Sequence, residues 1–212
     1  MAAVRKIFAH KGLEGTTTRE LAKEAGVSEA LLYKHYPSKE ALFQAMLTTC
    51  DGEFMGEIKK ITSLEPSTST LVTLVHFLVS SMVNRRVPDL EIRLRLYLQS
   101  ISGDGEFARL IMKQKQESCS VVPTIAESIK AAVASGDIVE APVPAALRAL
   151  FVDRLATALV SDLLPAKPAL DYGVPLERLI EYTVWFALRG VGMKDEAIRR
   201  YYNPKALALL AA

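Results

Sequence analysis

The sequence predicts an all-α protein with a short N-terminal domain of three helices, residues 1–46, and a larger helical domain, residues 47–212. Three observations support this prediction. The segment from Thr17 to Lys39 has the signals of two short capped helices, a tight turn between them, and the start of a third helix. Beyond Lys39, apolar residues recur at helical spacing and are interrupted by segments rich in Pro and Gly. No run alternates polar and apolar residues as a half-exposed strand would.

The first helix of the capped segment has a defined start and a defined end. Thr17 and Glu20 have the spacing of a capping box, in which a hydroxyl and a carboxylate each accept a hydrogen bond from a free backbone N–H. Gly26 is expected to end the helix, because glycine adopts the left-handed conformation at no steric cost.

The second helix follows at once. Ser28 is its expected N-cap, and Pro37 limits it. Leu32 and Tyr36 lie four residues apart, so they are expected to face the core together. The remaining face carries a small Ala, a Tyr, a Lys and a His, which suit close approach and hydrogen bonding to phosphate. This layout is that of a helix-turn-helix motif, which places its second helix in the major groove of DNA.

The segment from Ile7 to Met46 resembles the DNA-binding domain of the TetR family of bacterial transcriptional regulators. The resemblance rests on a combination of motifs, namely AKEAGVS at 22–28, LYKHY at 32–36 and SKEAL at 38–42. It implies a helix-turn-helix domain followed by a helical ligand-binding and dimerisation domain. It also implies a homodimer that binds a palindromic double-stranded DNA operator, most simply as a repressor, and is released by a small-molecule effector.

The resemblance further implies which residues contact DNA. The start of the first motif helix approaches phosphate, the first residues of the second meet base edges, and later residues hold phosphates. Glu29 is acidic where a DNA-facing residue is often neutral or basic, so it either accepts a hydrogen bond from cytosine N4 or points away. The expected DNA-binding residues are Thr17, Thr18, Arg19, Ser28, Glu29, Ala30, Leu31, Tyr33, Lys34, His35 and Lys39.

The charge and the cysteine content are consistent with this interpretation but do not establish it. The formal net charge of the chain is +2, and residues 1–50 already contain seven basic against five acidic residues. The slight basicity is therefore concentrated at the N-terminal end, and DNA affinity would depend on placement and dimerisation rather than on bulk charge. Cys50 and Cys119 are far apart and fit no CxxC pattern, so neither a disulfide nor a metal site is expected.

Further helices are expected after the motif, joined by polar or Pro-rich connections. Pro123 is expected to mark either a kink or the start of a helix. No secretory signal is visible, and Asp153 and Arg154 interrupt the apolar stretch at 145–164, so a cytoplasmic protein without a membrane span is expected. The expected helices cover residues 40–61, 70–84, 87–100, 106–135, 145–164, 176–191 and 194–210.

Two residue sets in the larger domain have expected roles. A ligand pocket would need bulky side chains with an occasional polar group, and the candidates are His76, Met82, Tyr97, Met112, Cys119, Phe151 and Trp185. The helices at 145–164 and 176–191 are apolar over more than one face, which is typical of a buried helix or a subunit interface. Leu155, Leu159 and Trp185 are the residues expected at a dimer interface.

No catalytic constellation is found, so no enzyme activity, cofactor or metal is expected. The three histidines stand alone, and no HExxH, GxSxG or GxxxxGK[ST] motif occurs. The segment GDGEFA at 103–108 matches a GxGxxA fingerprint but follows an expected helix rather than a strand, so it is interpreted as a turn. The alternative function is an all-helical small-molecule-binding protein that has lost specific operator binding.

Overall fold

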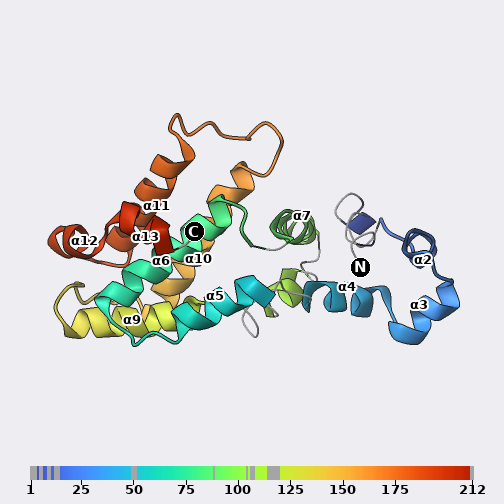
Figure 1. Ribbon diagram of the computed structural model, residues 1–212, viewed down its shortest axis with the longest axis horizontal. Coiled ribbons are helices and arrows are strands. Elements are labelled where there is room, and N and C mark those ends of the chain that lie inside the picture. Colours follow the sequence, from blue (N-terminus) through green and yellow to red (C-terminus); the bar gives the residue numbers. More distant parts are fainter. Residues whose placement is uncertain are drawn as a thin grey trace. The chain divides into compact units, whose positions relative to one another are not determined.

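The computed structural model describes residues 4, 7, 8, 11, 15–48, 52–87, 89–103, 105, 108–113 and 120–210. Within these ranges the protein is helical without any strand, and one isolated antiparallel bridge pairs Ile138 with Met193 (Figure 1). The prediction of an all-α fold is confirmed. None of the helices in the described ranges combines the length and apolarity needed to cross a bilayer.

The helix boundaries follow the signals in the sequence closely. Pro123 lies in the first turn of its helix, so it marks a start rather than a kink. The expected helix at 40–61 is represented by two helices on either side of residues 49–51, which lie outside the described ranges, and residues 108–113 are also helical. The helices are α2 (Thr18–Ala25), α3 (Glu29–His35), α4 (Lys39–Thr48), α5 (Gly52–Thr62), α6 (Thr68–Val83), α7 (Leu90–Ile101), α9 (Val122–Ala134), α10 (Ala145–Asp162), α11 (Leu176–Gly190), α12 (Asp195–Tyr201) and α13 (Pro204–Leu210).

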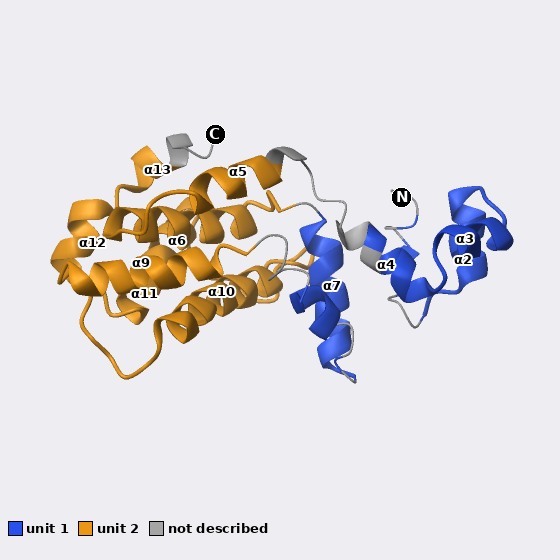
Figure 2. Cartoon of the chain, turned by 90° about the horizontal axis from the view of Figure 1, so that it is seen from below, with its two compact units in different colours: residues 1–52, 88–119 blue, residues 53–87, 120–212 orange. Residues whose placement is uncertain are grey.

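The chain divides into two compact units, each formed from two stretches of sequence (Figure 2). Unit 1 contains residues 1–52 and 88–119, and unit 2 contains residues 53–87 and 120–212. The boundaries of these two units thus differ from the expected boundary after residue 46, because α7, which comes later in the chain, packs with the N-terminal helices.

The core of unit 1 shows why that later stretch belongs there. Phe8 and Phe43 meet edge to face with ring centroids 5.4 Å apart, and both are fully buried. Leu96 of α7 and Ile111 are buried in the same cluster. The remaining buried members of this cluster come from α2, α3 and α4 and from the segment before them: Val4, Leu21, Ala22, Leu32 and Leu42.

Unit 2 is built around α6. All of the 16 residues of α6 except Ser69 and Thr73 are buried, and α9, α10, α11, α12 and α13 all pack against it. A helix that is apolar on every side must be covered on every side. The helices after α9 therefore each turn one face toward α6 and leave another face outward.

Candidate nucleic-acid interface

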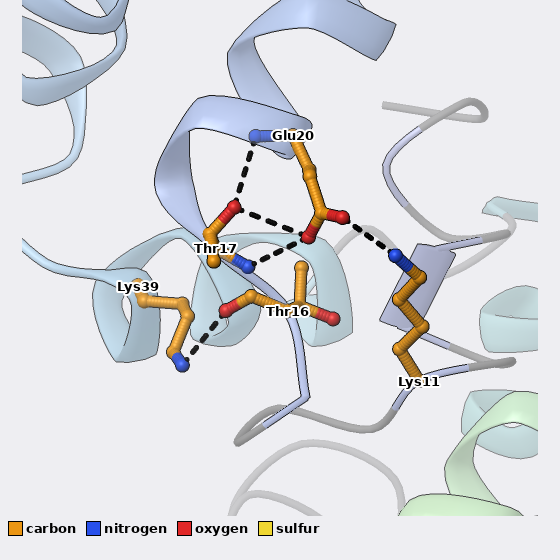
Figure 3. Close-up of polar contacts among 5 residues, drawn as sticks. All are labelled: Lys11, Thr16, Thr17, Glu20 and Lys39. Atoms are coloured by element: carbon orange, nitrogen blue, oxygen red, sulfur yellow. Dashed lines mark hydrogen bonds and ion pairs between the residues drawn. The ribbon is translucent and has the colours of Figure 1, made fainter.

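The predicted capping box is present at the start of α2 (Figure 3). The Thr17 hydroxyl accepts from the backbone N–H of Glu20 at 3.2 Å, and the Glu20 carboxylate accepts from the backbone N–H of Thr17 at 3.1 Å. Lys11 Nζ lies 2.5 Å from Glu20 Oε1. Hydrogen bonds from Lys11 and Thr17 lower the pKa of Glu20 to about 2. The first turn of α2 is therefore held by the side chains around it.

The start of α4 is tied to the segment before α2. Ser38 Oγ accepts from the backbone N–H of Ala41 at 3.1 Å, as the side chain of an N-cap residue does. Lys39 Nζ donates to the backbone carbonyl of the buried Thr16 at 2.9 Å (Figure 3). Since an ammonium group has three N–H donors, Lys39 can hold this carbonyl and still meet a phosphate. Its phosphate contact stays a prediction.

The turn between α2 and α3 forms as the sequence indicates. Gly26 ends α2 with φ of 68°, a left-handed conformation that favours glycine. Ser28 caps α3, and its Oγ accepts from the backbone N–H of Leu31 at 3.1 Å. Leu32 is buried in the core of unit 1, and Tyr36 packs against that core. The other face of α3 is consequently turned outward.

That outward face carries the side chains expected to meet DNA. Leu31 and Tyr33 are 43% and 47% exposed, so both side chains are accessible to a ligand on this face. The structure brings the expected DNA-binding residues onto the surface of one unit, although their contacts with DNA stay predictions. They are Thr17, Thr18 and Arg19 at the start of α2, Ser28, Glu29, Ala30, Leu31, Tyr33, Lys34 and His35 at α3, and Lys39 at α4.

Three of these side chains connect α2 to α3 directly. Tyr33 Oη donates to Thr18 Oγ1 at 3.2 Å, and Thr18 Oγ1 donates to Glu29 Oε1 at 2.8 Å. Sequence reasoning missed this chain of hydrogen bonds. It joins residues 11 and 15 positions apart, so it depends on how the two helices pack rather than on spacing within one helix.

The described residues of the set expected to line a ligand pocket belong to both units. His76 and Met82 are buried on α6, and Trp185 is half-buried on α11. Phe151 on α10 is 56% exposed. Tyr97 and Met112 belong to unit 1, and Cys119 lies outside the described residues. The pocket stays a prediction, and within unit 2 only His76 and Met82 of this set are fully interior.

His76 has an unusual setting for a buried histidine. Its ring lies 6.0 Å from that of the buried Tyr202, and neither His76 Nδ1 nor Tyr202 Oη has a hydrogen-bond partner among the described residues. Burial lowers the pKa of His76, against the opposing charge of Glu181. Burial and then the Glu181 charge raise the pKa of Tyr202. Tyr202 carried no signal in the sequence, since only the packing of the C-terminal segment on α6 brings it to His76.

The residues expected at a dimer interface differ in how deeply they are buried. Leu159 is 6% exposed and lies in the core of unit 2, whereas Leu155 and Trp185 are half-buried. The large apolar side chains that α10 and α11 expose lie elsewhere on these helices. They are Leu147 and Phe151 on α10 and Leu176, Tyr182 and Phe186 on α11.

No metal site competes with this interpretation in the part of the chain that the structure describes, since no group of three or more His, Cys, Asp or Glu side chains there could hold an ion.

Comparison with known proteins finds a family match for the N-terminal segment. Residues 1–46 match the family model described as bacterial regulatory proteins, tetR family. The chain is 33% identical over 84 residues to the nucleoid occlusion factor SlmA of Vibrio cholerae, covering 40% of this chain and 43% of that protein. It is 39% identical over 62 residues to SlmA of Mannheimia succiniciproducens, covering 29% of each chain. The matches thus span less than half the length of these relatives.

Solved structures share the fold over most of the chain. A tetR-family regulatory protein from Rhodococcus RHA1 superposes with a TM-score of 0.63 at 23% identity, covering 92% of this chain and 95% of that one. GusR from Salmonella enterica gives a TM-score of 0.60 at 20% identity, with 90% and 92% covered. AibR, in complex with isovaleryl coenzyme A and operator DNA, gives 0.59 at 18% identity, with 87% and 93% covered. At these identities the likeness shows the fold alone.

His76 should make the stability of unit 2 depend on pH. Its pKa is lowered in the folded chain, so its contribution to stability is present above the unfolded value of about 6.5 and is lost as pH falls through the folded value. Replacing His76 with Leu should remove this loss, because leucine has no proton to bind. Urea unfolding at about pH 7.5 and about pH 5.5 measures the difference.

Tyr202→Phe is the matched control, since it removes the neighbouring unpaired hydroxyl and keeps the imidazole. It should retain the pH dependence of the unaltered chain. Equal pH dependence in the His76→Leu variant and the unaltered chain would show that the imidazole is not responsible.

Proposed function

We propose that this chain, whose N-terminal domain belongs to the tetR family of bacterial regulatory proteins, is a ligand-responsive transcriptional repressor. As a homodimer it binds a palindromic operator in double-stranded DNA, and a small-molecule effector releases it. The observation that carries the proposal is the outward face of α3, which is capped, held against α2 and rich in side chains suited to DNA.

The DNA-binding part of the proposal follows from the placement of that face. The first residues of a reading helix reach base edges, and here Glu29, Ala30 and Leu31 are exposed at the start of α3. Exposed Lys34 and His35 follow in the last turn, where they can meet the phosphate backbone. A single motif of this size gives little specificity, so two copies in register with two half-sites are expected.

The proposed dimer uses the outward faces of α10 and α11, which pack against each other in unit 2. Phe151 on α10 and Tyr182 and Phe186 on α11 are 56%, 57% and 68% exposed. Exposed aromatic side chains on neighbouring helices are typical of an interaction surface. A second copy of the chain is the partner proposed, because a dimer also supplies the second reading helix.

The effector part of the proposal rests on the fold and on one interior feature. AibR, which shares the fold, was solved with both isovaleryl coenzyme A and operator DNA. In this chain His76 and Tyr202 place inside unit 2 two polar atoms that have no hydrogen-bond partner within the described ranges. An effector can release DNA only if it binds the DNA-free conformation more tightly than the DNA-bound one.

The proposal is tested by selecting binding sites from a pool of random double-stranded DNA with the full chain. We expect a palindromic sequence whose half-sites are separated by about one helical turn, with an affinity that falls as salt rises. Selection of no sequence, together with weak binding to all DNA, would support the alternative of a small-molecule-binding protein that no longer reads an operator.

Lys39 and Lys34 should each contribute one phosphate contact. Replacing either with Ala should weaken binding to all sequences about equally and reduce the salt slope by about one unit. Only Lys39→Ala should also lower the melting temperature, because only Lys39 holds the Thr16 carbonyl. Titrations at several salt concentrations and thermal unfolding separate the two effects. An unchanged salt slope would remove that lysine from the interface.

Phe186→Glu should convert the dimer into a folded monomer that binds the operator weakly. The substitution places a charge on the exposed side of α11, where two copies would bring two carboxylates together in a poorly hydrated interface. Sedimentation and circular dichroism measure assembly and folding.

Two variants make this measurement specific. Leu159→Glu should unfold the chain rather than dissociate it, because Leu159 is buried within unit 2. Lys205→Glu introduces a carboxylate at an exposed position on α13, a helix that is not part of the proposed surface, and should change neither assembly nor folding. A Phe186→Glu variant that remains a dimer with full operator affinity would place the interface elsewhere.

A further inference from the structure

The chain of hydrogen bonds between α2 and α3 ends on a carboxylate. Tyr33 Oη donates to Thr18 Oγ1, and Thr18 Oγ1 donates to Glu29 Oε1. The Tyr33 proton is thus directed to Thr18, and the Thr18 proton is directed to Glu29. Glu29 and Tyr33 are four residues apart on the same face of α3, and Thr18 opens α2. The three side chains bridge the two helices on the exposed side of unit 1.

This arrangement holds Glu29 by one oxygen only. Within the described residues, Glu29 Oε2 makes no hydrogen bond, and the side chain is exposed in the first turn of α3. A carboxylate held in this way has already lost much of its rotational freedom before it meets a ligand. Its second oxygen is a fixed, charged hydrogen-bond acceptor at the end of the helix that reaches base edges.

We propose that Glu29 is a specificity-determining residue that selects cytosine at one position of each operator half-site, and that Thr18 is its positioning residue. This inference rests on the proposed function, since it requires that α3 enters the major groove. It resolves the two roles that the sequence left open for Glu29, because a side chain held by Thr18 at the exposed start of α3 is not turned away from the DNA-facing surface.

Cytosine is favoured because an ionised carboxylate has no hydrogen-bond donor. An ionised carboxylate accepts hydrogen bonds and donates none. In the major groove cytosine presents the N4 amino donor, whereas guanine presents the acceptors N7 and O6 and thymine presents O4. Adenine presents a donor beside the acceptor N7, so it is intermediate. Glu29 would therefore attract cytosine and repel guanine, which gives discrimination by both effects.

A Gln at position 29 provides the sharpest test. Its amide oxygen can still accept from Thr18, and its amide nitrogen then stands where the second carboxylate oxygen stood. That position becomes a donor, which suits the acceptors N7 and O6 of guanine rather than the amino donor of cytosine. After the operator is selected with the unaltered chain, its affinity is measured by fluorescence anisotropy for duplexes carrying each of the four bases at every position of the half-site. We expect one position at which cytosine is preferred over guanine by about tenfold.

The variants should act at that position alone. Glu29→Gln should shift its preference from cytosine toward guanine, and Glu29→Ala should abolish the preference there. Glu24→Gln neutralises an exposed carboxylate on α2 instead of α3, and it should leave the base preference at that position unchanged. If Glu29→Ala instead raises affinity for all sequences equally, the carboxylate acts only by repelling phosphate, and the proposal is overturned. It is also overturned if Glu29→Ala leaves every base preference intact.

Thr18 is tested by the same base-substitution measurement. Thr18→Val keeps the shape of the side chain but removes the hydroxyl, so it should reduce the discrimination at the Glu29 position while preferences at other positions hold. A lost phosphate contact would lower the affinity for all four bases equally, so it would not change the ratio of affinities between bases at that position. Thr18→Ser should restore the discrimination. Full discrimination in Thr18→Val would remove Thr18 from this role.

The outcomes also separate this inference from the function on which it rests. A selected operator whose bases are read without regard to residue 29 overturns the inference and leaves the proposed function standing. Failure of the unaltered chain to select any sequence overturns both.

Discussion

Unit 2 depends on the burial of α6 on all sides. Because nearly every residue of α6 is covered, α9 through α13 must surround it, and each covering helix has a second face that α6 cannot use. On α10 and α11 these outward faces carry Phe151 and Phe186. The same constraint places a polar group in the interior, since Nδ1 of His76 on α6 is buried and has no hydrogen-bond partner among the described residues. The proposed dimer surface and the interior polar site are both consequences of one buried helix.

The proposed DNA-reading surface depends on a different kind of constraint. Thr17 and Ser28 fix the starts of α2 and α3, and Gly26 fixes the turn between them. Each of these devices acts over three or four residues, and each was predicted from the sequence. They determine which face of α3 is buried through Leu32, and the opposite face is therefore presented outward.

Contacts between elements could not be predicted in this way. The Tyr33–Thr18–Glu29 hydrogen bonds and the entry of Leu96 into the N-terminal core both require helices to be placed against one another, which local spacing does not encode. The apolar residues of α10 show a second reason. Leu159 was expected at an interface but is buried, because a helix that is apolar over several faces gives no periodic signal of which face its own subunit covers.

An ion pair in unit 2 lies next to two of the points where the chain passes to unit 1. The chain passes between the units after residues 52, 87 and 119. Arg86, beside the second crossing, donates from Nη2 to both carboxylate oxygens of Glu57 on α5, which lies just after the first, at 2.7 and 3.0 Å. A charge-assisted pair of this kind fixes direction as well as distance. Within unit 2, the segment that follows the first crossing and the segment that precedes the second are therefore tied together by this pair.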